Sequence, residues 1–206
     1  QVEDIIKQKI TRLIPRESFD FLFAQKVRAR STKYSFTGYG WPSASRRWCT
    51  GQKQRAIDAY TKALTWKGFA LPVIQCIGYA ADEPKRVEKH SKTRLSRFQG
   101  FEYPMMAWGV TEAQALEYCK ECGLFWDGLY DIFDRVSCWC CPLGGISRAE
   151  KVYHHFPELW QRMLEMESWL PEQYRSYAGK HTVSDLDRRF SEENARRLRQ
   201  SPQEAA

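Results

Sequence analysis

Long apolar runs are missing from this sequence of 206 residues, and none approaches the roughly 20 residues that a membrane-spanning helix needs. The first ten residues, QVEDIIKQKI, lack the basic-then-apolar layout of a secretory signal peptide, and they also lack an initiator methionine. We therefore expect no membrane association and a cytoplasmic location, and we expect the chain to be a fragment or a processed product.

The absence of an export signal changes how the seven cysteines are interpreted. In a reducing compartment, cysteines in this number favour metal binding or redox chemistry over a disulfide framework. The formal net charge of +7 predicts a polyanionic partner, either a nucleic acid or a phosphate-rich nucleotide. A protein partner or a homodimer is compatible with the same sequence.

Two short strands are expected in the first half of the chain. The loosely alternating residues 9–14 end at a proline and predict one of them. The other is predicted over residues 71–80, LPVIQCIGYA, whose almost unbroken apolar run is typical of a strand buried on both faces of an α/β sheet. Cys76 lies inside this run, so we expect it to be a small core residue.

Several helices are expected along the chain. Thr111 and Gln114 have the spacing of a capping box and predict the start of a helix. A last helix is expected to begin near Ser184. It is highly charged, with few apolar anchors, among them Leu186 and Phe190, and we expect it to be peripheral.

The stretch 134–143, DRVSCWCCPL, places three thiols within four positions and dominates any functional reading. Together with Cys119 and Cys122, the pair Cys138 and Cys141 gives the spacing C-x2-C-x15-C-x2-C, which is the pattern of a zinc ribbon. The same thiols could instead hold an iron–sulfur cluster, whose four cysteines can come from distant segments. The sequence leaves both hypotheses open.

Four ordered motifs carry a resemblance to a known family. They are RRWCTxxK at 46–53, GYxxDExxR at 78–86, YPxxxWGxTE at 103–112 and GLYxxFxRxxCWCCP at 128–142. Together they resemble the phosphoadenosine phosphosulfate (PAPS) reductase family over residues 9–190. The nearest similarity is to its phage- and bacterial-type branch, which is related to the sulfur-transfer proteins of DNA phosphorothioation.

The resemblance implies a Rossmann-like α/β fold of the adenine nucleotide alpha-hydrolase type, with a partial parallel sheet and a helical C-terminal region. It also implies a 4Fe–4S cluster. Cys49 matches the second cysteine of the family's early pair, where Trp48 replaces the first, and Cys138 and Cys141 match the late pair. Cys140 is the candidate for the fourth ligand. An adenine nucleotide and its oxyanion are then expected at Arg46, Arg47, Lys53, Asp82, Glu83 and Arg86.

Two departures from the family pattern limit the activity that the resemblance implies. The phosphate loop of the SGGxDS type is absent, so the first strand–loop–helix unit is expected to be missing from an α/β domain over residues 1–168. No cysteine follows Cys141, although the reductases carry a nucleophilic one near the C-terminus. We therefore expect adenine-nucleotide-dependent sulfur chemistry rather than sulfonucleotide reduction itself. Residues 169–206 are expected to form a helical extension with a disordered tail at 200–206. The alternative hypothesis is a zinc-ribbon module that binds nucleic acid without catalysis.

Overall fold

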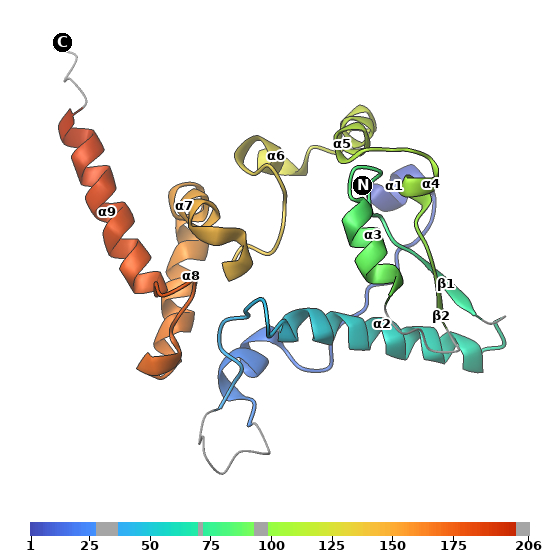
Figure 1. The fold of residues 1–206 in the computed structure, drawn as a ribbon, viewed down its shortest axis with the longest axis horizontal. Coiled ribbons are helices and arrows are strands. Elements are labelled where there is room, and N and C mark those ends of the chain that lie inside the picture. The colour runs from blue at the N-terminus through green and yellow to red at the C-terminus, as the bar shows by residue number, and fades with distance from the viewer. Residues whose placement is uncertain (28–36, 70–71, 93–98, 201–206) are drawn as a thin grey trace. The chain divides into compact units, whose positions relative to one another are not determined.

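The computed structural model describes residues 1–27, 37–69, 72–92 and 99–200 (Figure 1). The chain divides into two compact units that alternate along the sequence. The first unit comprises Gln1–Pro15 and Gln52–Gly128, and the second comprises Arg16–Gly51 and Leu129–Ala206. The expected boundary after residue 168 lies inside the second unit. Of the tail expected to be disordered, residues 201–206 lie outside the described residues.

The first unit contains a β–α–β arrangement. Strand β1 (Val73–Cys76) pairs in parallel with β2 (Gln99–Glu102), with Val73 opposite Gln99 and Cys76 opposite Glu102. The helix α3 (Pro84–Ser91) lies between the two strands in sequence. The structure therefore confirms a mixed α/β content at the coarse level, with a two-stranded parallel sheet in the part of the chain that is described.

The remaining elements of the first unit are helical. The expected capping box is confirmed, because Gln114 N donates to the hydroxyl of Thr111 at 3.3 Å and the Gln114 side chain accepts from the Thr111 N–H. These helices are α1 (Val2–Ile6), most of α2 (Trp48–Trp66), α4 (Pro104–Ala107), α5 (Glu112–Glu121) and the short η2 (Trp126–Gly128).

The strand expectations need correction. Residues 9–14 form no strand, and β1 is shorter than the expected 71–80. Burial alternates along β1, and both Ile74 and Cys76 are exposed rather than in a core. The physical reason is that a strand becomes buried on both faces only when other layers cover both faces. Within the described residues β2 is the single strand beside it.

The second unit is built on three mutually contacting helices (Figure 1). They are α7 (Gly145–His155), α8 (Pro157–Ser168) and α9 (Val183–Gln200). Each presents apolar residues at helical spacing to one core, which also includes Phe23 of the preceding segment. Shorter elements complete this unit: η1 (Phe21–Gln25), α6 (Leu129–Ile132), η3 (Pro142–Gly144) and η4 (Glu172–Tyr174).

Helix α9 is not peripheral, contrary to the expectation from its charge. Val183, Leu186 and Phe190 are at most 1% exposed, whereas Leu198 is 78% exposed. The spacing of the first three residues places them on one face of the helix, so the charged residues occupy the opposite face. Helix α9 is therefore amphipathic and packs one face into the core, while its C-terminal end near Leu198 is exposed.

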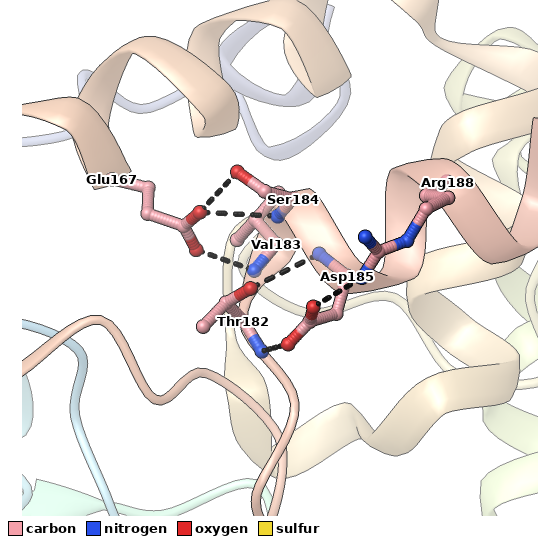
Figure 2. Close-up of polar contacts among 6 residues, drawn as sticks. All are labelled: Glu167, Thr182, Val183, Ser184, Asp185 and Arg188. Carbon is pink, nitrogen blue, oxygen red and sulfur yellow. Dashed lines mark hydrogen bonds and ion pairs between the residues drawn. The ribbon is translucent and has the colours of Figure 1, made fainter. Parts of the chain in front are cut away.

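A buried carboxylate anchors the start of α9 (Figure 2). Glu167 of α8 is 2% exposed and accepts hydrogen bonds from the backbone N–H of Val183, from the backbone N–H of Ser184 at 3.1 Å, and from the Ser184 hydroxyl. The capping pair itself is formed by Thr182 and Asp185, each of which donates its backbone N–H to the other's side chain. Thr182, not Ser184, therefore caps the helix, and Glu167 satisfies further N–H groups of its first turn.

Candidate cysteine and oxyanion site

The cysteine stretch folds as a tight turn that leads directly into α7. Cys141 donates its backbone N–H to the carbonyl of Cys138 at 3.2 Å, and Gly144 donates to the carbonyl of Cys141 at 3.1 Å. Pro142 is buried, and Trp139 packs against the core of the second unit. The core thus holds the turn on both sides of Cys140, which is itself 7% exposed.

Three other cysteines lie near the Cys140 thiol. Burial first, and then charge repulsion from Cys138, Cys141 and Cys49, raise the pKa of Cys140 to about 12. All four belong to the second unit, although 88 residues separate Cys49 from the turn's first cysteine. The structure therefore brings the predicted cluster ligands into one neighbourhood.

Cys49 reaches this neighbourhood from the first turn of α2. The preceding residue, Trp48, donates its indole N–H to the carbonyl of Gly40 at 3.0 Å and stacks on Tyr39 at 5.5 Å between ring centroids. The Trp48 side chain is used for packing, and that packing fixes the position of Cys49.

The four thiols at this turn are the candidate metal ligands of the second unit. Among the described residues, no group of three or more His, Cys, Asp or Glu side chains is arranged to hold one metal ion. An iron–sulfur cluster contains several irons and sulfides, so its thiolate ligands lie further from one another than those of one zinc ion. The donor set is all sulfur, as such a cluster requires.

The two remaining zinc-ribbon cysteines belong to the other unit. Cys119 lies on α5 and Cys122 directly after it. A hydrogen bond with Cys122 is the main cause of a raised pKa at the neighbouring Tyr118. The zinc ribbon, which needs these thiols together with Cys138 and Cys141, remains a prediction.

Two cavities flank the cysteine turn within the second unit, and the consecutive residues Arg46 and Arg47 line different ones. Arg47 and Cys141 line a cavity of about 640 Å³. Arg46 lines a cavity of about 440 Å³ that also has aromatic walls. The two cavities have Leu143 in common, so both predicted arginines lie beside the cysteine turn.

The aromatic walls of the smaller cavity come from Trp41, Tyr174 and Tyr177. Trp41 and Tyr177 meet edge to face at 5.0 Å between ring centroids. The pKa of Tyr177 is raised, first by burial and then by the nearby thiols of Cys140 and Cys141. This cavity therefore lies beside the end of the cysteine turn, where Pro142 and Leu143 line it.

The other predicted oxyanion residues lie in the first unit. Arg86 pairs with Glu83 at 2.5 Å, and its guanidinium lies 4.4 Å from the ring centroid of Tyr79. Asp82 accepts the backbone N–H of Glu112 at 3.2 Å. They follow β1 directly, which is where ligands bind in open α/β sheets. Lys53 lies on α2 in the same unit.

Three basic residues that the sequence motifs do not single out, Arg135, Arg148 and Lys151, line the larger cavity with Arg47. Their signal in the sequence is weak. Arg148 and Lys151 are three residues apart on α7, and they follow the pair Gly144 and Gly145 at its start. Only the folded turn brings Arg135 next to them.

Comparison with protein-family models, with curated proteins and with solved structures finds no match. Within the described residues, no helix combines the length and apolar character that crossing a membrane requires.

Proposed function

We propose that this chain is a PAPS-reductase-like iron–sulfur protein that takes part in adenine-nucleotide-dependent sulfur chemistry. The observation that carries the proposal is the gathering of Cys49, Cys138 and Cys141 around Cys140 within one unit. Three of these cysteines are neighbours in the sequence, so the support comes from the electrostatic interaction of the distant Cys49 with Cys140.

The environment of Cys140 favours the neutral thiol unless a bound cation stabilises the thiolate. Thiolates, not thiols, ligate metals, and burial among other thiols disfavours the thiolate, so the pKa of Cys140 is raised to about 12. A metal-bound thiolate is neutralised by the metal's charge, which removes this penalty. When bound, the cluster would supply an electron-transfer or electrostatic centre beside the cavities that Arg46 and Arg47 line.

For the nucleotide, we propose a Rossmann-like arrangement of which β1, α3 and β2 are one β–α–β part. Parallel pairing of β1 with β2 supports this, and so does the position of Asp82 and Glu83 just after β1. Arg86 would contribute positive charge for the nucleotide's oxyanion, and Lys53 a second one.

Elemental analysis of anaerobically purified protein tests the cluster. We expect about four irons and as many acid-labile sulfides per chain, with the broad visible absorbance of thiolate-bound clusters. Cys49→Ser and Cys140→Ser should lose this iron, whereas the matched controls Cys119→Ser and Cys122→Ser should keep it. Stoichiometric zinc that is lost in the two control variants would refute the cluster and support the zinc ribbon.

A separate measurement tests the nucleotide. Binding of an adenine nucleotide should be weaker in Arg86→Ala than in Lys89→Ala, which removes a neighbouring charge on the same helix. Equal affinity of these two variants would contradict a role for Arg86. The iron content is unaffected by either result, so the two parts of the proposal are tested independently.

A further inference from the structure

The larger cavity beside Cys141 is strongly cationic. It has a volume of about 640 Å³, which is within the usual range of small-molecule sites, roughly 300–1,000 Å³. Four basic side chains line it, against the single carboxylate of Asp134. The basic residues are Arg47, Arg135, Arg148 and Lys151.

Neutral groups hold the Arg148 side chain in place, so its positive charge is not neutralised. Its guanidinium donates to the backbone carbonyls of Arg135 at 2.7 Å and Ser137 at 3.0 Å, and it lies 4.4 Å from the ring centroid of Phe133. Carbonyls are neutral acceptors, so the positive charge persists. Its Nε–H is buried and has no acceptor among the described residues. A fixed cation with an unused donor therefore forms one wall of the cavity.

The one carboxylate does little to offset this charge. Asp134 is fully exposed, and its closest oxygen is 3.8 Å from the Lys151 ammonium. An ion pair of this length in solvent is strongly screened and contributes little. The field inside the cavity is therefore dominated by its basic residues.

The start of α7 adds backbone donors at the same place. Gly144 and Ser147 line the cavity, and the N-cap residue Gly144 gives α7 no side-chain cap. The N–H of Gly144 already donates to the carbonyl of Cys141, and that of Gly145 to the carbonyl of Pro142, so the donors for a ligand come from the residues that follow in the first turn. A Cβ at position 144 would lie 2.2 Å from Cδ of Arg148, so a larger residue here would displace that side chain. N–H groups in the first turn of a helix lack intrahelical acceptors and carry partial positive charge, so they favour anions.

We propose that this cavity binds a tetrahedral oxyanion, either sulfate or phosphate, as a free ion or as the end group of a nucleotide. Arg47 and Lys151 provide the mobile charges, Arg148 the fixed one, and the start of α7 the backbone donors. The site deepens the proposed function, on which it rests for the oxyanion expected at Arg47, but it requires neither a bound cluster nor any residue of the first unit. It places the oxyanion beside Cys141.

Calorimetric titration of the full chain with sodium sulfate, sodium phosphate, adenosine monophosphate and adenosine tests the site, at ionic strength held constant with sodium chloride. The two inorganic ions should bind, and adenosine should not. Arg47→Gln and Lys151→Gln should each weaken sulfate binding about tenfold, as expected for loss of one charge-assisted contact. Lys180→Gln, a change of the same charge outside the cavity in the same unit, should leave it unchanged.

The titration with adenosine monophosphate distinguishes a free anion from the phosphate group of a nucleotide. Adenosine monophosphate binding that weakens in parallel with sulfate in Arg47→Gln and Lys151→Gln would place its phosphate in this cavity. Nucleotide binding that persists while sulfate binding is lost would restrict the cavity to the free ion. Absence of sulfate and phosphate binding, or an equal loss in Lys180→Gln, would overturn the proposal. Iron content reports on the cluster alone, so failure of one claim is distinguishable from failure of the other.

Discussion

Replacing Glu167 with alanine should detach the first turn of α9 from α8. In the folded chain this carboxylate lies in the core and accepts from two backbone N–H groups and one hydroxyl, on Val183 and Ser184 (Figure 2). In Glu167→Ala these donors have no acceptor from α8. Water reaches them only if the helix start moves away from the core, because Val183 is completely buried.

The magnitude follows from the cost of unpaired buried donors. Each costs about 1–3 kcal/mol, and relief from burying the carboxylate offsets part of the sum. We therefore expect Glu167→Ala to lower the free energy of unfolding by about 3 kcal/mol. At about 2–4 °C per kcal/mol for a chain of this size, the midpoint temperature should fall by about 6–12 °C.

Glu167→Gln should give an intermediate loss. One carboxylate oxygen accepts both groups of Ser184, and the other accepts Val183 N–H. A glutamine carbonyl can retain the contacts to Ser184, whereas its NH2 group would face the Val183 donor. We expect a loss of about 1–2 kcal/mol, roughly one unpaired donor.

Urea unfolding and amide hydrogen exchange over 182–190 provide the measurements, with Glu165→Ala as the control on the same helix. Glu165 pairs with Arg162 at 3.1 Å on the surface, so its loss should cost less than about 1 kcal/mol. Exchange at the start of α9 should accelerate in Glu167→Ala alone. Equal stability of Glu167→Ala and Glu165→Ala, or unchanged exchange in the former, would refute the argument.

Three further predictions concern other parts of the second unit. Thr182 lowers the pKa of Asp185 below its ordinary 3.8 by hydrogen bonding, so the stabilisation should be present above that value and be lost as the pH falls through the folded pKa. Acid titration of the unfolding free energy should be flatter in Asp185→Asn. In metal-free protein, Cys138 should react with iodoacetamide before Cys140, because Cys138 is exposed whereas burial raises the pKa of Cys140 to about 12; mass spectrometry of labelled peptides reads this order. Gly38→Ala should destabilise the chain by more than about 1 kcal/mol in urea unfolding, because φ is 81° and a Cβ would lie 2.2 Å from a backbone oxygen of η1.

Each of these predictions has a result that contradicts it. A steeper acid profile in Asp185→Asn would mean that another carboxylate governs acid unfolding. Simultaneous labelling of the two cysteines would show that the turn opens readily. Gly179→Ala is the control for Gly38→Ala, since its φ is also positive but a Cβ there meets nothing within 4 Å. An equal loss in both variants would show that conformation, not contact, sets the cost.

Local patterns predicted local structure well where the deciding interactions lie within a few residues. The capping box at Thr111 and Gln114 is confirmed because both partners lie in one turn of the chain. The expectation that α9 is peripheral was wrong. It rested on the charge of the whole helix, whereas burial depends on the single face that carries Leu186 and Phe190.

The strand at 71–80 shows the opposite failure. Its apolar run was correctly interpreted as extended, since Val73–Cys76 forms β1. Burial on both faces was wrong, because that property belongs to the layers around a strand and not to the strand's own residues. The exposed side chain of Ile74 follows from the small sheet.

By itself, the sequence determined the crowding of Cys138, Cys140 and Cys141 in one turn, because covalent connection keeps neighbours together. Only the tertiary structure decided that Cys49 approaches them and that Arg47, Arg148 and Lys151 line one cavity with Cys141. Their approach depends on the core of the second unit, against which Trp48 and Trp139 pack, and such packing acts over distances that no local pattern encodes. The spacing of residues along the chain can thus predict candidate ligands, but the fold determines which of them lie close together.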